Sequence, residues 1–392
     1  LNGTHTMYKG ETHDVNIQMI YQGMGGALNQ RQAMTQGIEA HKKVEFVLTM
    51  NYVMNTSAKY SDVVLPVTTE WERPGTLLTG NREILIYGQH ITEPLYEAKS
   101  DQEIAIGIGE KLGFKAEEIY DIDETQQLFN KLAGCTVLGS DGTTKETLLT
   151  ITEDDIAEMG VNGSLQEGKI TLQEFKERGI YQVERTDGDA YANLPFAKFI
   201  EDPEANPVAT ASGKFEIYCQ SLSSYIDHIG FSEKDPLPKY VRITEGYEDG
   251  IENGRPFQLL TQHYQRRSHH VFDNVNWLRE AWPQELWINA SDAAELGISE
   301  GDAVRLSSPY GSVVRPAFVT QRIMPKTIGL GEGAWAQLDE NGDDIAGATN
   351  TLSSPIPTGQ GHTGFNSNNC TIEKYSGSLD PDCEWPQRIV FE

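Results

Sequence analysis

The sequence predicts an α/β domain followed by a β-rich domain that closes into a small barrel. In the first part, apolar strand-like runs alternate with helical stretches, as in a parallel sheet whose strands are joined by helices. From Gly213 onward the chain changes to short apolar runs separated by Gly and Pro turns, with few helical patterns. Such a pattern is typical of a closed barrel, which leaves no exposed sheet edge.

The elements of the α/β part follow from apolar periodicity and from turn and capping residues. They are expected as strands at 15–21, 44–49, 62–65 and 82–87, helices at 32–42, 55–60 and 102–112, and a loop at 71–80. Asp101 is expected to cap the last helix, which Gly113 ends. This part forms the first domain, residues 1–115.

Two polar or glycine-rich segments follow strands of this sheet. They are the turn at 23–26 and the pair Met50 and Asn51. Ligands of parallel sheets lie beyond the carboxyl ends of strands, so both segments are candidate ligand contacts. The turn also fits an ordinary tight turn with positive φ, and Asn51 also fits an ordinary strand end.

The remaining chain divides into an uncertain region and the barrel. Residues 116–207 have no clear pattern beyond a helix at 171–178, and we expect an insertion or linker there. Residues 208–392 form the β-rich domain. Its elements are expected as strands at 214–218, 257–261, 286–289, 303–308, 312–319 and 327–331, with a helix at 291–296.

Composition restricts the possible functions. The chain has 58 acidic and 31 basic residues and a net charge of −27, so nucleic acid is not an expected partner. Hydrophobic residues make up 38% and mean hydropathy is −0.46, with no run near the roughly 20 apolar residues of a membrane helix. The cysteines form no CxxC pair and are expected as free thiols. They are Cys135, Cys219, Cys370 and Cys383.

One stretch of this acidic chain, residues 259–290, concentrates hydrogen-bond donors at the end of an expected strand. These donors are His263, Arg266, Arg267, Ser268, His269 and His270. Guanidinium, hydroxyl and imidazole groups bind phosphates and similar anions, so the stretch predicts a site for a phosphate- or pterin-type ligand. The alternative is a polar loop that covers the barrel. Adjacent residues of a strand face opposite sides, so His269 and His270 do not predict a metal site.

Several motifs resemble the dimethyl sulfoxide reductase family of molybdopterin guanine dinucleotide oxidoreductases. They are TSAKYSDVVLP at 56–66, SGKFEIY at 212–218, the donor-rich stretch, and GISEGDAVRLSSPYGSVVRPAFVTQRIMP at 297–325. Residues 268–289 are most similar to the catalytic A subunits of the membrane-attached members. The resemblance covers about 13–113 and 208–375.

The resemblance implies a Rossmann-like first domain, the family's third, and a double-psi β-barrel, its fourth, which together contact two pterin dinucleotides that chelate one molybdenum. It implies cofactor contacts at Gly26, Met50, Asn51, Thr261, Gln262, His263, Arg267, Ser268, His269, His270, Asn350, Asn366 and Ser367, with His362 as a further candidate. Asn51 departs from the family, which often has an acidic residue nearby. Asn350, Asn366 and Ser367 also fit turn residues that satisfy their own backbone.

The function implied is oxygen-atom transfer from dimethyl sulfoxide or a related S- or N-oxide. The family's protein ligand to molybdenum and the cysteines of its 4Fe-4S cluster belong to an N-terminal half. Because the sequence opens at Leu1 without Met, we expect a C-terminal fragment that is inactive alone, without catalytic or metal-ligating residues of its own. The expected partners are that N-terminal half, an iron–sulfur electron-transfer subunit and a membrane anchor subunit, outside the cytoplasm.

Two other functions compete with this one. The chain could be a stand-alone, non-enzymatic pterin-dinucleotide-binding module, or a family member that acts on another oxo substrate. A pyridine-nucleotide dehydrogenase is disfavoured, because QGMGGA at 22–27 lacks the GxGxxG spacing and no ribose-binding acid follows at the usual distance.

Overall fold

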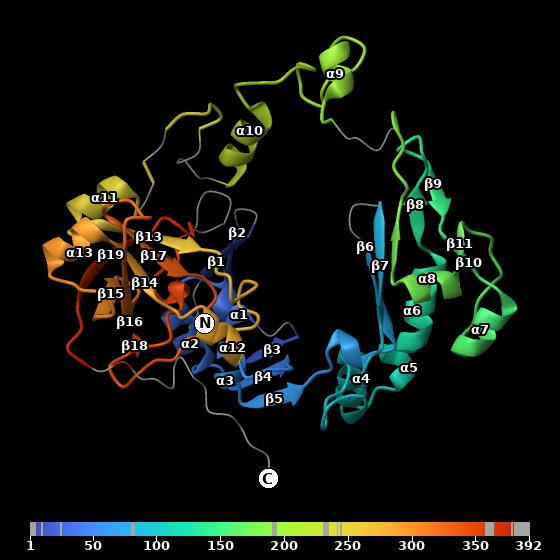
Figure 1. Cartoon of the computed structure of the whole chain (residues 1–392), viewed down its shortest axis with the longest axis horizontal. Helices are drawn as coiled ribbons and strands as arrows, with labels where there is room; N and C mark the ends of the chain where they lie inside the picture. The colour runs from blue at the N-terminus through green and yellow to red at the C-terminus, as the bar shows by residue number, and fades with distance from the viewer. Residues whose placement is uncertain are drawn as a thin grey trace. The chain divides into compact units, whose positions relative to one another are not determined.

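The computed structural model of the chain describes residues 5–8, 11–23, 26–79, 83–189, 194–229, 235–240, 242–243, 245–356, 364–377 and 379. It contains two compact units (Figure 1). Unit 1 comprises residues 1–64 and 216–392, and unit 2 comprises residues 65–215. The chain thus leaves unit 1 after Val64 and returns to it at Glu216, so the compact units do not end at 115 and 207. The division into three successive domains stays a prediction.

The α/β part of unit 1 has the expected strand–helix–strand order. Its sheet has the order β3-β4-β5, and β3 and β4 are parallel, with Tyr21 opposite Leu48. The elements are β3 (Met19–Gln22), α1 (Ala27–Gln30), α2 (Met34–His41), β4 (Phe46–Asn51), α3 (Thr56–Lys59) and β5 (Val63–Pro66). The first strand begins at Met19 rather than at residue 15, because pairing with β4 starts at that position.

The second part of unit 1 is a closed six-stranded barrel. The strand order is β14-β17-β13-β19-β15-β16, and β16 also pairs with β14, which closes the ring. The strands are β13 (Phe257–Gln262), β14 (Leu286–Asn289), β15 (Ala303–Ser308), β16 (Gly311–Thr320), β17 (Thr327–Gly331) and β19 (Asn369–Lys374), with β18 (Asp343–Asp344) at the edge of β16. The expected small closed barrel is confirmed, whereas the double-psi and Rossmann-like topologies stay predictions.

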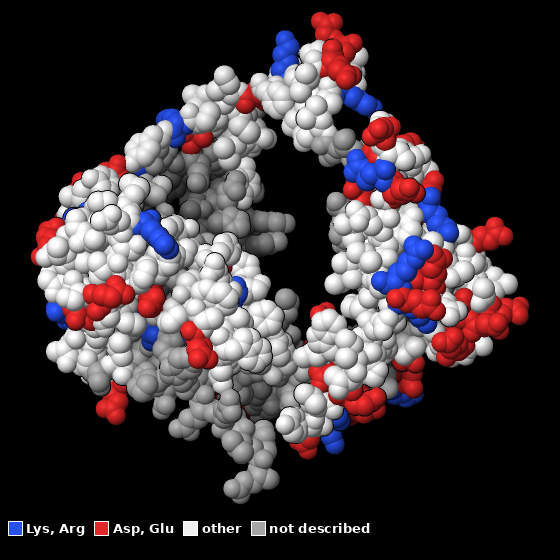
Figure 2. All heavy atoms as spheres, viewed as in Figure 1, with Lys and Arg blue, Asp and Glu red and all other residues white. Residues whose placement is uncertain are grey.

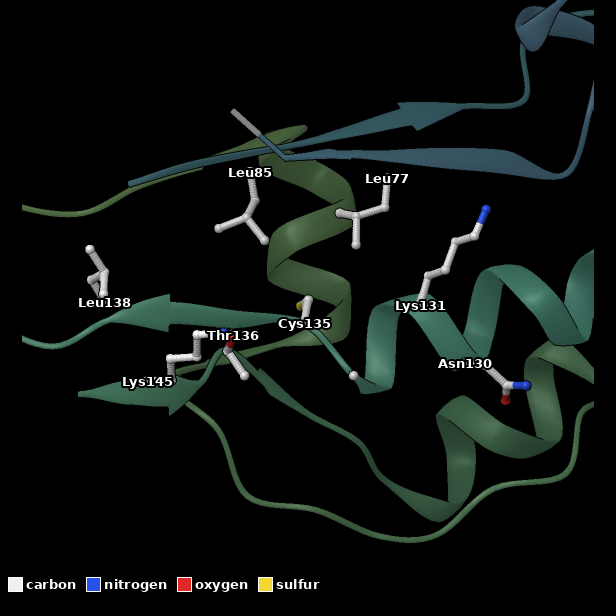
Figure 3. Close-up of a pocket in the computed structure, with 9 residues that line it drawn as sticks. Leu77, Leu85, Asn130, Lys131, Cys135, Thr136, Leu138 and Lys145 are labelled. Carbon is white, nitrogen blue, oxygen red and sulfur yellow. The ribbon is translucent and has the colours of Figure 1, made fainter. Parts of the chain in front are cut away.

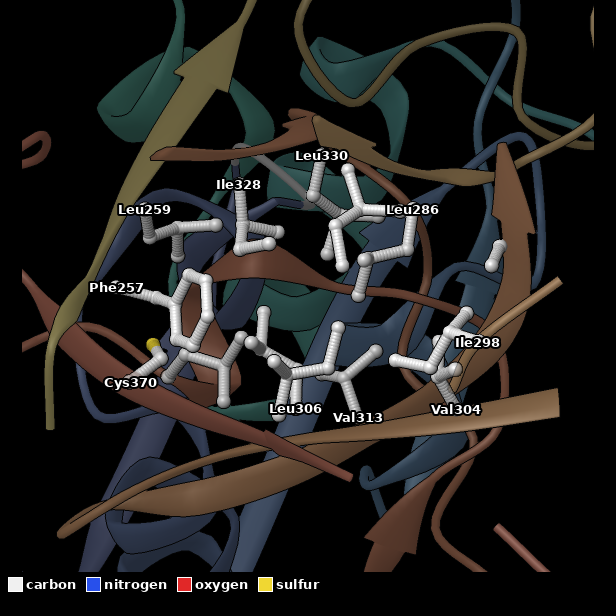
Figure 4. Close-up of a cluster of buried hydrophobic side chains, with 14 of the residues drawn as sticks. Phe257, Leu259, Leu286, Ile298, Val304, Leu306, Val313, Ile328, Leu330 and Cys370 are labelled. Carbon is white, nitrogen blue, oxygen red and sulfur yellow. The ribbon is translucent and has the colours of Figure 1, made fainter. Parts of the chain in front are cut away.

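Alternating side chains of these strands fill the barrel (Figure 4). Val304 and Leu306 of β15 and Ile328 and Leu330 of β17 are fully buried. Each such side chain contributes roughly 1.5–3 kcal/mol on burial, so the ring is the principal apolar core of unit 1. Helix α13 (Ala290–Leu296), capped by Asn289, links β14 to β15.

The α/β part and the barrel share an apolar contact within unit 1. Leu28, Met34 and Ile38 pack with Ala334, Ala336 and Ala348. Two hydrogen bonds join the same segments: Asn29 Nδ2 donates to the carbonyl of Ala334 at 2.9 Å, and the N–H of Ala336 donates to Thr56 Oγ1 at 3.0 Å. The first and last parts of the chain therefore build one site-bearing body.

Unit 2 is folded throughout most of its length. It contains η1 (Glu70–Glu72), β6 (Gly75–Thr79), β7 (Ile84–Gln89), α4 (Asp101–Lys111), α5 (Ala116–Ile119), α6 (Glu124–Ala133), β8 (Thr136–Leu138), β9 (Lys145–Thr147), β10 (Leu149–Thr150), α7 (Glu153–Met159), β11 (Ile170–Thr171), α8 (Leu172–Arg178), β12 (Ile180–Gln182) and α9 (Ala197–Glu201). Its core includes Leu85, Phe129, Leu132 and Phe175. Residues 116–207 are therefore largely structured.

Three sequence-based expectations are wrong. Residues 71–80 are not all loop, because β6 pairs with β7, Leu77 opposite Tyr87. Ser100, rather than Asp101, caps α4, since its hydroxyl accepts from the N–H of Glu103. Residues 214–218 form no strand: Phe215 and Ile217 are 62% and 76% exposed, and no strand among the described residues pairs with them.

Other elements of the described chain are short. They are β1 (His5–Tyr8), β2 (Glu11–Asp14), α10 (Gln220–Ile229), α11 (Tyr247–Glu252), α12 (Asn276–Ala281) and η2 (Thr349–Thr351). None of the described helices is both long and apolar enough to cross a membrane. On the face drawn in Figure 2, acidic side chains cover much of the surface of unit 2, with basic ones between them. Cys135, Cys219 and Cys370 are free thiols, as expected, and Cys383 lies outside the described residues.

Candidate functional site

Two pairs of parallel strands bring the predicted site residues to strand ends. Gln262 at the end of β13 is opposite Gly331 at the end of β17, so the loops that follow leave from the same edge of the barrel. His263 begins one loop and Glu332 the other. Likewise Gln22 of β3 is opposite Thr49 of β4, which puts the turn before Gly26 and the pair Met50–Asn51 at one edge. Met24 and Gly25 of that turn lie outside the described residues.

A buried ion cluster holds the loop that follows β13. Oδ1 of Asp273 lies 3.1 Å from Nη2 of Arg266 and 2.9 Å from Nη1 of Arg267, and Oδ2 lies 3.2 Å from Nη2 of Arg279. The N–H of Trp335 donates to Oδ2 at 2.9 Å. Burial opposes the charge of Asp273, but the three guanidinium groups hold its pKa below the usual value. The buried carboxylate of Asp273 therefore holds the loop after β13 in place through ion pairs and a hydrogen bond in the protein interior.

Arg267 points into the protein. Its Nε donates to the carbonyl of Glu332 at 2.8 Å, its Nη1 to Asp273, and its Nη2 to the side chain of Gln284 and the carbonyl of Gly331. Burial lowers the pKa of Arg267 to about 10, and Asp273 offsets part of this effect. In this arrangement the guanidinium positions the loops after β13 and β17, and its predicted contact with a ligand stays a prediction.

Three side chains meet at the outer face of these loops. Nδ1 of His269 lies 3.0 Å from Oε1 of Glu332, and Nε2 of His263 lies 3.3 Å from the same oxygen. The side chains of His263 and His269 are 83% and 71% exposed, so both present nitrogen atoms to solvent. The backbone of His269 has a positive φ of 52°, which is uncommon for a residue other than glycine.

His270 instead packs against the α/β part. A Cβ atom added at Gly26 would lie 2.2 Å from Nε2 of His270, so only glycine allows this approach. Burial, followed by the charge of His269, lowers the pKa of His270. Two residues far apart in the sequence, both predicted as cofactor contacts, are thus in close contact, and this contact is called the cradle below.

Further residues that the sequence predicted as cofactor contacts form hydrogen bonds with other parts of the chain. Both the N–H and the hydroxyl of Thr261 donate to Oδ1 of Asn366 at 2.9 Å. Nδ2 of Asn350 donates to the carbonyl of Asn29 at 2.6 Å, which ties it to α1. The hydroxyl of Tyr21 donates to the sulfur of Met50 at 3.0 Å. These contacts hold the side chains in place in this structure.

The remaining predicted residues make hydrogen bonds that involve the backbone. Oδ1 of buried Asn51 accepts from the N–H of Val53 at 3.3 Å, the carbonyl of Gln262 accepts from Glu332 at 2.9 Å, and the N–H of Ser367 donates to Gly364 at 3.4 Å. Ser268 is exposed. His362 lies outside the described residues.

The cavity drawn in Figure 3 belongs to unit 2 and contains none of the predicted residues. It measures about 410 Å³, and Leu77, Leu85 and Leu138 form much of its wall, with Lys131 and Lys145 beside them. Its apolar lining suits a small apolar group rather than a phosphate-rich dinucleotide. The strand ends of unit 1 remain the better candidate.

Sequence reasoning missed several residues on which the site depends. Asp273, Arg279, Gln284 and Trp335 support the loop from the interior, and Glu332 joins it at the surface. A signal for Glu332 was available: it lies between Gly331 and Gly333, directly after a strand that the sequence predicts. The other four are recognised only from the folded arrangement.

Two family profiles match separate parts of the chain. The molybdopterin oxidoreductase family profile matches residues 5–111, and the molydopterin dinucleotide binding domain profile matches residues 257–376. The chain is 32% identical to dimethyl sulfoxide reductase DmsA of Escherichia coli K12, over 88% of this chain and 40% of the relative. Both profiles and this relative support assignment of the chain to the dimethyl sulfoxide reductase family. Molybdenum held by molybdopterin guanine dinucleotide is the corresponding cofactor.

Other relatives extend the comparison. Dimethyl sulfoxide reductase DmsA of Haemophilus influenzae is 30% identical over 80% of this chain and 36% of its own length. The dimethyl sulfoxide/trimethylamine N-oxide reductase of Cereibacter sphaeroides is 27% identical over 93% of this chain and 42% of its length. The chain thus spans about two fifths of these relatives.

A solved structure supports the fold. Acetylene hydratase from Pelobacter acetylenicus superposes with a TM-score of 0.62 at 18% identity, over 91% of this chain and 44% of the hydratase chain. At this identity the likeness concerns the fold alone.

Proposed function

We propose that these 392 residues are the dinucleotide-binding portion of a molybdenum-dependent reductase that removes an oxygen atom from dimethyl sulfoxide or a related S- or N-oxide. The observation that carries the proposal is the cradle between Gly26 and His270 beside the exposed donors of the β13 loop. The printed names of the relatives support the substrate class.

The residues present fit a pterin dinucleotide. Glycine at position 26 lets the imidazole of His270 lie directly against the backbone at a strand end, where the ligands of parallel sheets bind. His263 and His269 offer exposed nitrogen atoms, and Thr261 with Asn366 offers a hydroxyl and an amide at the same barrel edge. Asn350 and Ser367 are further donors, and Met50, Asn51, Gln262, Arg267 and Ser268 complete the proposed set.

When bound, the molybdenum cofactor supplies the oxygen-atom and electron transfer. The chain's own part is to bind and orient the dinucleotides. The buried Arg266–Arg267–Asp273 cluster fixes the loop, so that its imidazoles do not have to be ordered when the ligand binds. The positive charge in this loop also offsets ligand phosphates within a chain that is acidic overall.

The family's protein ligand to molybdenum and its 4Fe-4S cysteines would be supplied by sequence outside these residues, as the coverage of the relatives suggests. We therefore propose that these residues alone do not catalyse the reaction. An iron–sulfur subunit, a membrane anchor and an extracytoplasmic location are proposed from the resemblance alone.

The test uses the native polypeptide that contains these residues, captured from anaerobically grown cells. Molybdenum is measured by mass spectrometry, guanine nucleotide after acid hydrolysis, and activity as oxidation of a reduced viologen dye by dimethyl sulfoxide or trimethylamine N-oxide. We expect both components of the cofactor and activity with at least one oxide. Absence of molybdenum and guanine nucleotide would refute the proposal, and a loaded protein without either activity would refute the substrate class.

Matched variants then test the site. Gly26→Ala should lower the molybdenum content, because its methyl group displaces His270 from the cradle. Gly107→Ala is the control, since a Cβ atom there meets nothing within 4 Å. Equal loading of the two variants would exclude the cradle as part of the binding site.

A further inference from the structure

We propose that His263, His269 and Glu332 bind a divalent transition-metal ion of the Zn²⁺ class, separate from molybdenum. Their donor atoms converge at the barrel edge. Nε2 of His263 and Nδ1 of His269 lie 3.3 and 3.0 Å from Oε1 of Glu332. All three atoms lie within 4.8 Å of one another.

The spacing of these atoms suits a metal ion. Zinc binds imidazole nitrogen and carboxylate oxygen at about 2.0–2.2 Å in a tetrahedral arrangement, which puts neighbouring ligand atoms roughly 3.3–3.6 Å apart. The two measured distances to Glu332 are already close to that range. The ligand atoms of His263 and His269 lie within 4.8 Å of each other, so rotation of these exposed side chains would bring them into that range.

The backbone that carries these ligands is fixed by contacts of its own. The carbonyl of Gln262, next to His263, accepts from the N–H of Glu332 at 2.9 Å. The carbonyl of Glu332 accepts from buried Arg267 at 2.8 Å. A Cβ atom at Gly333 would lie 1.8 Å from the carbonyl oxygen of His269, so the two loops are in close contact. A preformed ligand set of this kind needs little ordering when an ion binds.

The chemistry of the ligands selects the class of ion. Two imidazoles and one carboxylate suit Zn²⁺, Ni²⁺ or Cu²⁺, whereas Mg²⁺ and Ca²⁺ prefer sites made of oxygen atoms. Both imidazoles are largely exposed, so an aqueous ion can reach them and water can complete its coordination. The competing explanation is a pair of hydrogen bonds from the histidines to Glu332 without any ion.

This inference shares His263 and His269 with the proposed cofactor contacts, but it depends only on the geometry of the three donors. A bound ion and the dinucleotide would compete for these imidazoles. The test therefore uses the 392-residue chain without molybdenum cofactor, so that failure of metal binding and failure of the proposed function are distinguishable.

The chain is stripped of metal with a chelator and titrated with ZnCl₂ by isothermal calorimetry. We expect one site that H263N, H269N and E332Q each weaken by about tenfold or more, as loss of one of three ligands requires. H90N is the control, since His90 is an exposed histidine of unit 2 outside the cluster. Co²⁺ should give visible absorption bands of a low-symmetry site in the wild type and H90N only.

Equal Zn²⁺ affinity in all four variants would overturn the proposal, as would loss of binding in H90N. Thermal unfolding in chelator first establishes that each variant is folded. If a variant of His263, His269 or Glu332 does not fold, the proposal is tested on the wild-type chain by chemical modification of its histidines. Zn²⁺ should then protect His263 and His269, but not His90, from diethylpyrocarbonate, as mapped by mass spectrometry. Unprotected cluster histidines would refute the site.

Discussion

Replacement of Asp273 by Asn should strongly destabilise unit 1. The side chain of Asp273 is 1% exposed, and its two oxygens face three guanidinium groups and the N–H of Trp335. An Asn side chain keeps one acceptor oxygen. In either orientation of the amide, its NH₂ group faces N–H groups of the guanidinium groups or of Trp335, with which it cannot form a hydrogen bond. Removal of one partner from a buried ion cluster costs about 3–5 kcal/mol, because the remaining charges are buried without compensation. For a unit of this size, that corresponds to a fall in Tm of roughly 6–20 °C.

Calorimetry and urea denaturation of the whole chain, with tryptophan fluorescence, would measure this loss. Trp335 and Trp282 belong to unit 1 and contact the cluster, so their signal should report the change. The control is Asp302→Asn, because Asp302 forms a partly exposed ion pair with Lys374 at 2.8 Å, and surface pairs contribute at most about 1 kcal/mol. A loss below 1 kcal/mol for Asp273→Asn, or one no larger than that of the control, would refute the reasoning.

The pH dependence provides an independent check. The folded-state pKa of Asp273 is held below its unfolded value, so its contribution is complete above the unfolded pKa of about 3.9. The contribution is lost as the pH falls through the folded pKa. The stability difference between wild type and Asp273→Asn should therefore be constant near neutral pH and narrow in strong acid. A difference that instead widens with acid would contradict this assignment.

Four further predictions concern other contacts. Gly26→Ala should destabilise unit 1 by about 1–3 kcal/mol in urea denaturation, because the added methyl group meets the imidazole of His270. A second substitution, His270→Ala, should recover part of this loss. If the losses of the two single variants simply add in the double variant, the two side chains do not clash. His270→Gln should reduce the loss of unfolding free energy below pH 6.5, since the lowered pKa of His270 favours its neutral form in the folded state. Burial raises the pKa of Asp344 to about 6, and this group changes stability in the opposite direction, so the variant is compared with wild type at each pH. Identical pH dependence of stability in the two proteins would contradict the prediction. Iodoacetamide should modify Cys219 in the folded C383S chain well before Cys135 and Cys370. Burial raises the pKa of Cys135 to about 11 and that of Cys370 to about 12, which keeps both as unreactive thiols. Equal modification rates of the three cysteines, measured by peptide mapping, would contradict this prediction. Ser100→Ala should cost unit 2 about 1 kcal/mol, measured calorimetrically, whereas Asp101→Ala should cost less if Ser100 is the cap.

The barrel was predictable because its strands alternate in sequence as they do in space. In residues 303–308, Val304 and Leu306 point into the core, and the residues between them are only partly buried. The same alternation at 214–218 led to a wrong strand, since no strand of the described part of the chain pairs with Phe215 and Ile217. Local periodicity therefore indicates which faces are apolar, whereas a strand also needs a partner.

Much of unit 2 was not predictable for the same physical reason. Strands β10 and β11 contain only two residues each, and Leu149 pairs with Ile170 across a helix and a loop. So short a strand has no periodic signal of its own. It forms because Leu148, Leu149 and Leu172 are buried in a shared core.

For the candidate site, the residue types indicated the donor-rich stretch at 259–290, but they did not indicate which of its side chains are buried. Arg267 and His269 are two positions apart, and the sequence assigns both to a ligand. In the structure Arg267 is buried against Asp273, whereas His269 is 71% exposed. A charge partner was present in the same stretch, because Asp273 follows Arg267 by six residues. The sequence does not reveal that this carboxylate meets three guanidinium groups.

This division into buried and exposed donors decides which substitutions can report on binding. A change at Arg267 removes hydrogen bonds to Asp273, Gln284 and Glu332, so reduced binding of any ligand would accompany loss of the folded loop. A change at His269 removes one exposed contact, to Glu332, and leaves the ion cluster intact. Since exposed ion pairs contribute at most about 1 kcal/mol, His269→Asn should leave stability nearly unchanged. Lost ligand affinity in that variant would therefore report the site itself, whereas lost affinity in an Arg267 variant would not.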